Sequence, residues 1–167
     1  LTKNLHNIRP LLHYIYTSYN ENDQKRGMIL AYNGLKASHR YPVYYSGKTT
    51  VDWQTLKELP YYNSRSANIG VSWWSHTIGG FKEGIEDPEL YMRYVQLGAF
   101  SPIFRFASAG GHYYKREPWL WDVKIKEIAQ DYCQLRQRLI PYLYGEAYKY
   151  HKTGLPLIQP LYYKYPK

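Results

Sequence analysis

The sequence is poor in cysteine, the residue that forms disulfides and many structural zinc sites. Its 167 residues include one cysteine, Cys133, which excludes an intrachain disulfide and a cysteine-rich zinc site. No run of about 18 apolar residues occurs, so the sequence predicts no membrane-spanning helix and no membrane partner. The chain opens with neither an initiator methionine nor a signal peptide. We therefore expect a fragment or processed product and a cytoplasmic location.

Acidic residues are also scarce, because 13 Asp and Glu are outnumbered by 22 Lys and Arg, which gives a formal net charge of +9. A charge of this size raises nucleic acid as a partner. The basic residues are scattered, however, and the densest stretches, "DVKIKE" and "LRQRL", have the spacing of a solvated helix face. We therefore expect no nucleic-acid partner.

Aromatic residues are abundant, with 21 tyrosines and five tryptophans. Both side chains combine a large apolar body with a polar tip, which suits cores, interfaces and the stacking faces that bind sugars or bases. The hydrophobic fraction of 44%, without low-complexity stretches, favours a folded chain about one domain long.

Helical and strand-like patterns alternate along the chain. Apolar residues at three- and four-residue spacing predict helices over residues 3–20, 52–63, 87–98 and 122–151. Pro141 is expected to divide the last helix, which should stop at Thr153-Gly154. Short apolar runs predict strands at residues 27–34, 68–76, 101–106 and 155–163.

Strands that are separated by helices imply parallel βαβ units and an α/β fold. Only four strands are predicted, too few for a closed eight-stranded barrel of roughly 250 residues. Composition and periodicity leave open whether the chain is half a barrel or a small open α/β domain.

Longer motifs narrow this choice. Four segments follow one another in the sequence: "SWWSHTIGGF", "EDPELYMRYVQLGAFSPIFRF", "YYKREPWLWD" and "LRQRLIPYLYGEAYKYHKTGLPLIQPLYY". In order and spacing they resemble the C-terminal half of the catalytic barrel in glycoside hydrolase family 31, which contains α-glucosidases and α-xylosidases. The resemblance implies a partial (β/α)8 TIM-type barrel of about four βα units with parallel strands. Residues 1–167 would form this single fragment domain.

The activity implied by the resemblance is hydrolysis of O-glycosidic bonds of α-glucosides by a retaining mechanism, with no metal or other cofactor. Such chemistry needs two carboxyl groups about 5–5.5 Å apart, one as nucleophile and one as acid/base. In the family the nucleophilic aspartate lies on a strand before the region matched here. The chain therefore begins too late to contain it.

The acid/base position is altered. The stretch "YYSGKTTVDWQTL", residues 44–56, carries Lys48 where the family has an aspartate. The unperturbed pKa of lysine is about 10.4, so at neutral pH its side chain is a cation without an acceptor. Lys48 is no simple replacement for a carboxyl group.

Three further pocket positions depart from the family pattern. Thr77 stands where the family has a sugar-binding aspartate, and Ala107 where it has a sugar-binding histidine. Tyr32 matches a position that often holds an arginine. Because the surrounding motifs are retained while these positions are replaced, the resemblance predicts that this segment is catalytically inactive as it stands.

Three residues are candidates for substrate binding. Trp74 matches an aromatic residue that lines the family's sugar pocket. His76 is expected at the end of a strand, where barrel active sites form, although a hydrogen bond to nearby backbone is the simpler interpretation. Arg105 is a candidate for holding a pocket carboxylate, or for pairing with Glu117 or Asp122.

Two carboxylates, Asp52 and Glu117, survive near the loops. For Asp52 a helix cap is the simpler role, and for Glu117 a contact with Arg116 or Lys115.

Two functional hypotheses stay open. The chain is either an enzyme fragment that needs a separate N-terminal half, or a non-catalytic carbohydrate-binding or self-associating half-barrel scaffold. If any binding remains, the expected ligand is an α-linked glucoside or oligosaccharide; in the scaffold hypothesis either the aromatic residues still stack on sugars or nothing binds. Because a half-barrel exposes two sheet edges, we also expect a homodimer or a complementary half-barrel as partner.

Overall fold

The computed structural model describes residues 15–17, 28–31, 43–110 and 116–166 of the chain. Its centre is a parallel sheet of three short strands in the order β1-β2-β4. These strands are β1 (Leu30–Ala31), β2 (Val43–Tyr45) and β4 (Trp73–Ser75). A second, two-stranded parallel pair is formed by β3 (Thr50–Val51) and β5 (Lys82–Gly84). The fold is therefore α/β, with the parallel strands of a partial barrel.

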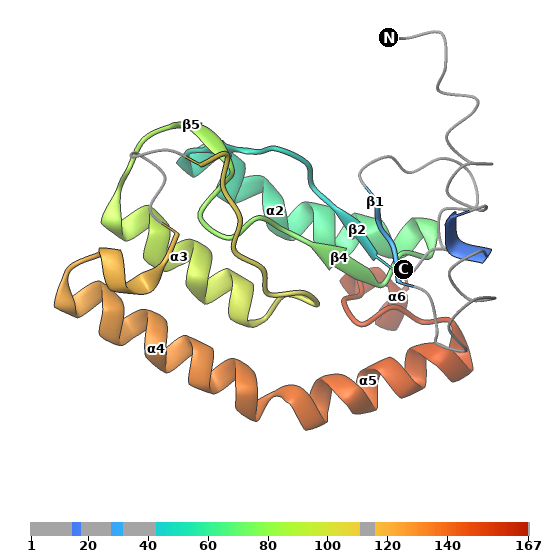
Figure 1. Cartoon of the computed structure of the whole chain (residues 1–167). Coiled ribbons are helices and arrows are strands. Elements are labelled where there is room, and N and C mark those ends of the chain that lie inside the picture. Colours follow the sequence, from blue (N-terminus) through green and yellow to red (C-terminus); the bar gives the residue numbers. More distant parts are fainter. Residues whose placement is uncertain (1–14, 18–27, 32–42, 111–115, 167) are drawn as a thin grey trace, which may run out of the picture.

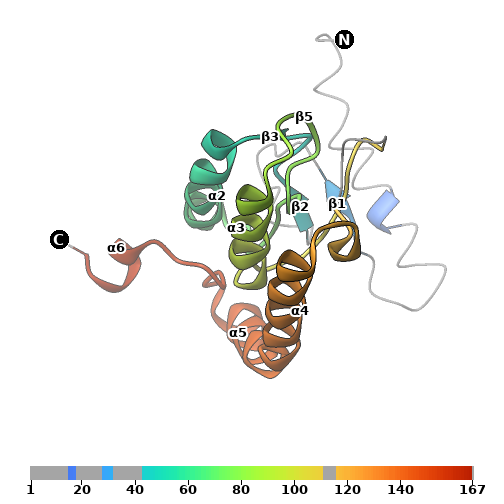
Figure 2. The ribbon, with the colours of Figure 1, turned by 90° about the vertical axis from the view of Figure 1, so that its left-hand side faces the viewer.

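A helical segment lies between the paired strands β2 and β4, and further helices follow β5. Between β3 and β4 lie helix α2 (Trp53–Ser66) and the 3₁₀ helix η3 (Ala67–Ile69), and β5 is followed by α3 (Pro88–Ala99). The remaining helices are η4 (Pro118–Leu120), α4 (Val123–Arg138), α5 (Ile140–Thr153) and α6 (Leu161–Lys164). Figures 1 and 2 show α2 on one flank of the sheet, with α4 and α5 running end to end along another side.

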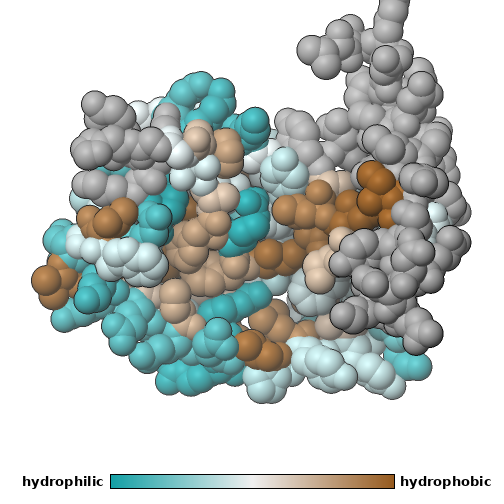
Figure 3. All heavy atoms as spheres, in the orientation of Figure 1, coloured by the Kyte–Doolittle hydropathy of each residue, from teal (hydrophilic) through white to brown (hydrophobic). Residues whose placement is uncertain are grey.

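Two hydrophobic clusters hold these layers together. The larger lies where α3 packs against α2 and α4, and its most buried members include Leu59, Ile78, Tyr94 and Val95. The smaller joins Ala31, Tyr44 and Val71 beside the sheet. Figure 3 shows further apolar residues at the surface over the strand region. This side of the sheet is only partly covered within the described residues.

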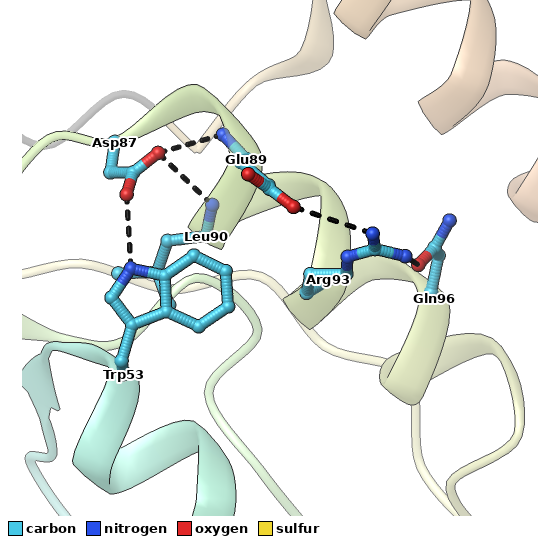
Figure 4. A network of polar contacts seen from close by, with 6 residues as sticks. All are labelled: Trp53, Asp87, Glu89, Leu90, Arg93 and Gln96. Carbon is cyan, nitrogen blue, oxygen red and sulfur yellow. Dashed lines mark hydrogen bonds and ion pairs between the residues drawn. The ribbon is translucent and has the colours of Figure 1, made fainter.

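Polar contacts fix where α3 begins. Asp87 caps the helix, because its Oδ1 accepts hydrogen bonds from the backbone N–H of Glu89 at 2.8 Å and of Leu90 at 3.3 Å. Its other oxygen accepts a hydrogen bond from the Trp53 indole at 3.0 Å, as Figure 4 shows. One aspartate thus ties the first turn of α2 to the first turn of α3.

The helix predictions are confirmed within the described residues. The helix predicted at 52–63 continues to Ser66, and the one predicted from Asp87 ends at Ala99. The long helix is divided at Leu139, two residues before Pro141, and stops at Gly154 in the left-handed conformation. Of the helix predicted at 3–20, only residues 15–17 are described, and they are helical.

The strand predictions were less accurate. The strand predicted at 27–34 is β1 within its described part, and the run 68–76 contains β4. The prediction of a strand at 101–106 is wrong, because this segment makes only two isolated parallel bridges, Ser75 to Ile103 and Ile78 to Phe106. Pro102 has no N–H to donate, and the Arg136 guanidinium bonds the carbonyls of residues 99, 101 and 102.

The strand predicted at 155–163 is also wrong. The segment is irregular and then enters α6, with Pro160 as its N-cap. Pro156 and Pro160 cannot donate ladder hydrogen bonds, and the N–H of Leu157 donates to the Ser72 hydroxyl at 2.9 Å. The sequence interpretation also missed β2, β3 and β5, each of which is only two or three residues long.

Within the described residues, no helix combines the length and the apolar character needed to cross a membrane.

Gly98 allows α3 to pack closely against the neighbouring loop. A β-carbon at this position would lie 2.6 Å from Ile78 Cδ1 and 2.7 Å from Phe104 Cδ2. We expect Gly98→Ala to lower the free energy of unfolding by about 1–3 kcal/mol, because the packed side chains must shift. Urea unfolding followed by circular dichroism measures this change.

Gly145 provides the matched control, since it also lies inside a helix but a β-carbon there would meet nothing within 4 Å. Gly145→Ala is expected to raise stability by about 0.5–1 kcal/mol through helix propensity alone. Equal effects of the two substitutions would contradict the packing explanation.

Candidate functional site

The candidate site lies at the carboxyl ends of β2 and β4 and beside the segment 101–107. Tyr44 is paired in register with Trp74, and Tyr45 with Ser75. Because successive side chains of a strand point to opposite faces, residues 74–77, at the end of β4 and just after it, divide into two groups. One group faces Arg105, and the other faces helix α2.

The first group surrounds Arg105. Its Nε donates a hydrogen bond to Ser75 Oγ at 3.1 Å, and its Nη2 donates to Thr77 Oγ1 at 3.0 Å. The guanidinium carbon lies 5.4 Å from the centre of the Tyr45 ring, within the range of a cation–π contact. Ser75 and Thr77 are fully buried. Burial lowers the pKa of Arg105, and the nearby Tyr45 opposes that shift.

Arg105 is therefore held by neutral side chains. Among the described residues its partners are two hydroxyl groups and an aromatic ring. It pairs with neither Glu117 nor Asp122, so the prediction of such a pair is wrong. Thr77 supplies a hydrogen-bond acceptor for the guanidinium but no negative charge.

Lys48 lies in the turn after β2 and is exposed. Its ammonium nitrogen is 5.8 Å from the centre of the Phe81 ring, a second cation–π contact. Ala107, at the end of the segment beside β4, is half-buried. Tyr32 lies outside the described residues. At the three described positions where the family pattern has acidic or imidazole groups, the structure thus has a cation, a hydroxyl and a methyl group.

The second group forms a chain of hydrogen bonds toward α2. The Trp74 indole N–H donates to Ser46 Oγ at 2.8 Å, and Ser46 Oγ lies 2.7 Å from His76 Nδ1. His76 Nε2 lies 3.0 Å from Asn63 Oδ1, on the buried side of α2. Because Asn63 Oδ1 can only accept, the Nε2–H of the neutral His76 ring donates to it. His76 Nδ1 is then an acceptor, and the Ser46 hydroxyl donates its hydrogen bond to that nitrogen.

These hydrogen bonds place a serine beside a histidine, the pairing found in nucleophilic catalysis. His76, however, is fully buried, and burial lowers its pKa from 6.5 to about 4. Such a histidine is a weak base at neutral pH, where a general base needs a pKa near the working pH. We therefore assign these hydrogen bonds a structural role, in which they fasten β2 and β4 to α2.

The structure separates the three predicted substrate-binding residues. Trp74 and His76 face α2, and the Trp74 ring stacks with Tyr44 and with Tyr62 at centroid distances of 6.4 Å and 6.3 Å. Arg105 belongs to the other group. The partners of His76 are side chains, so the expected bond to backbone is replaced by Ser46 and Asn63.

Sequence reasoning missed four residues of these two groups: Tyr45, Ser46, Asn63 and Ser75. Ser46 and Tyr45 lie in the stretch that holds Lys48, and strand alternation was the signal that would have assigned Ser75 to the side of Thr77. Nothing in the sequence pairs Asn63 with His76, because the contact joins different elements.

The two surviving carboxylates have the simpler roles. Asp52 caps α2, since its Oδ1 accepts a hydrogen bond from the Thr55 N–H at 2.6 Å. Glu117 accepts a hydrogen bond from the backbone N–H of Arg116 at 3.2 Å. Within the described part of the chain, no cluster of three or more His, Cys, Asp or Glu residues is placed to hold a metal ion.

Comparisons with known proteins agree with this arrangement. The family model described as "Glycosyl hydrolases family 31 TIM-barrel domain" matches residues 1–146. Neutral alpha-glucosidase AB from Homo sapiens is 32% identical over 99% of the chain, and alpha-glucosidase 2 from Bacillus thermoamyloliquefaciens is 33% identical over 85% of it. Each alignment covers 18% of the relative.

Among solved structures, a GH31 alpha-xylosidase from a soil metagenome, complexed with xylose, superposes with a TM-score of 0.84. It is 25% identical, and the match covers 93% of this chain and 26% of that one. The chain thus belongs to glycosyl hydrolase family 31, as the motifs predicted, and spans about a fifth of the length of the curated relatives it matches.

The depressed pKa of His76 predicts a loss of stability in acid. The unfolded chain takes up a proton near pH 6.5, whereas the folded chain does so only near 4, so the unfolded state binds more protons in between. The free energy of unfolding should therefore fall as pH is lowered through this interval, by on the order of 3 kcal/mol. Urea unfolding across that pH range measures the fall.

His76→Gln removes the titrating group and serves as the comparison, because the other acidic and basic residues are unchanged. The stability of this variant should depend less steeply on pH over the same interval. An identical pH dependence for the two proteins would rule out His76 as the source.

Proposed function

We propose that residues 1–167 are the C-terminal half of the catalytic barrel of a glycosidase that acts on O-glycosidic bonds of α-glucosides. The family membership and the α-glucosidase relatives support this assignment. We further propose that the segment by itself hydrolyses no glycoside, because the nucleophile of the family would lie upstream of it. A cytoplasmic location remains a prediction from the sequence.

The observation that carries the proposal of inactivity is the electrostatic character of the strand ends. Lys48 presents a cation, and the half-buried Arg105 is contacted by the neutral side chains of Ser75, Thr77 and Tyr45. A retaining mechanism stabilises a positively charged, oxocarbenium-like transition state with carboxylates. Lys48, at the position where the family has its acid/base aspartate, supplies no carboxylate, and its own positive charge would oppose that of the transition state.

A non-catalytic scaffold is the second candidate function, and the exposed aromatic surface of α5 and α6 favours it. Large side chains there are open to solvent: Tyr142, Tyr144, Tyr148, Leu161, Tyr162 and Tyr165. Exposed apolar area of this extent is typical of a surface that another chain covers. In this alternative, the half-barrel pairs with a second copy or with a complementary half.

Restoring the family residues tests the need for the missing half. The triple variant Lys48→Asp, Thr77→Asp, Ala107→His is expected to release no detectable product from an aryl α-glucoside, because it still lacks a nucleophile. The assay follows the absorbance of the liberated phenol, with the unmodified chain as control. Product release by the triple variant at a rate that scales with its concentration would refute the proposal.

Association can be tested on the unmodified chain, whose mass is 19.9 kDa. We expect light scattering after size-exclusion chromatography to give twice this mass, because open sheet edges and exposed aromatic residues favour pairing. Tyr144→Ser with Leu161→Ser should shift the protein toward the monomer, since these are the two most exposed large side chains of α5 and α6. A single monomeric peak for the unmodified chain would contradict the expectation.

A further inference from the structure

The outward face of α2 carries a hollow that the strand-end site does not use. Its volume is about 380 Å³, near the lower end of the range of small-ligand pockets, and four side chains line it: Glu58, Tyr61, Tyr62 and Arg65. They are spaced by three, one and three residues, so they share one face of the helix. A different face of α2 buries Leu59, Asn63 and Ser66.

Each lining side chain is held by a neighbour. The Arg65 guanidinium carbon lies 5.6 Å from the centre of the Tyr61 ring, and Gln54 Nε2 donates to Glu58 Oε1 at 2.9 Å. The Tyr62 ring is nearly parallel to Trp74, with an angle of 10° between the planes. Side chains that are already ordered lose less conformational entropy when a ligand binds.

We propose that this hollow binds carbohydrate, as a site separate from the carboxyl ends of the strands. The exposed tyrosine rings offer flat apolar surface, and the apolar C–H face of a pyranose ring packs on such a surface. Sugar hydroxyl groups both donate and accept hydrogen bonds. They match Glu58, which accepts only, and Arg65, which donates only.

The charge of the hollow selects against nucleic acid, the other common ligand of exposed aromatic rings. A groove for single-stranded nucleic acid combines stacking rings with a net positive charge that follows the phosphates. Here one carboxylate and one guanidinium balance each other, and Glu58 repels phosphate. A neutral ligand rich in hydroxyl groups fits this balance better.

One side chain of the hollow also packs against the sheet. Tyr62 stacks on Trp74, whose indole donates to Ser46, the residue that precedes the turn bearing Lys48. The site nevertheless needs no nucleophile and no acid/base, so it does not depend on whether the strand ends are active. Its function would be to hold an oligosaccharide on the outer surface of the barrel.

Titration calorimetry with maltotriose on the full chain tests the proposal. We expect saturable binding, with a Kd that rises at least tenfold in Tyr61→Ala and in Glu58→Gln. Phe100→Ala is the matched control, because Phe100 is an aromatic residue outside both proposed surfaces and is 60% exposed against 57% for Tyr61. This variant should bind as the unmodified chain does.

Three results would overturn the proposal: no saturable binding of maltotriose, binding that survives Tyr61→Ala, and an equal loss in Phe100→Ala. A hexamer of uridylate is titrated in parallel. Tighter binding of the hexamer than of maltotriose, lost in Tyr61→Ala, would overturn the carbohydrate assignment in favour of nucleic acid. Calorimetry measures whether the hollow binds maltotriose, and product release measures whether the segment hydrolyses a glycoside. A negative result for the hollow can therefore be told apart from a result that refutes the proposed inactivity.

Discussion

The fold depends on the parallel pairing of β2 with β4 and on the buried hydrogen bonds that fasten this pair to α2. The strands are only three residues long, so their backbone ladder alone is short. His76 joins Ser46, just after β2, to Asn63 on α2, and it stays neutral because it is buried. A buried neutral histidine with both ring nitrogens bonded fixes the spacing of strand and helix without the cost of a buried charge.

The same pair of strands sets the chemistry of the candidate site. Alternation along β4 directs Ser75 and Thr77 toward Arg105, away from the side where Trp74 and His76 contact α2. The scaffold of a family 31 barrel is thus retained, while the groups at its strand ends are a guanidinium, an ammonium and neutral hydroxyls. Fold and chemistry are separable here, because the packing of the helices does not involve the charge of these side chains.

Sequence reasoning succeeded where the determining forces are local. Asp87-Pro88-Glu89 marked the start of α3, and Pro141 with Gly154 marked the division and end of the last long helix, because caps and breakers act within a few residues. It failed at 101–106 and 155–163, where apolar content suggested strands. Whether such a segment joins a ladder depends on partners far away in the sequence. Here the carbonyl of Pro102 accepts a hydrogen bond from Arg136, and the N–H of Leu157 donates to the Ser72 hydroxyl.

The sequence by itself determined the family, the parallel α/β class and which residues stand at the candidate positions, since motifs and spacing are carried in the order of residues. Only the tertiary structure decided what those positions contact. It placed Thr77 under the Arg105 guanidinium, Lys48 beside Phe81, and Trp74 against α2. It also brought Glu58, Tyr61, Tyr62 and Arg65 into one hollow. Side-chain contacts between elements depend on how strands and helices pack, and this packing is a property of the whole chain.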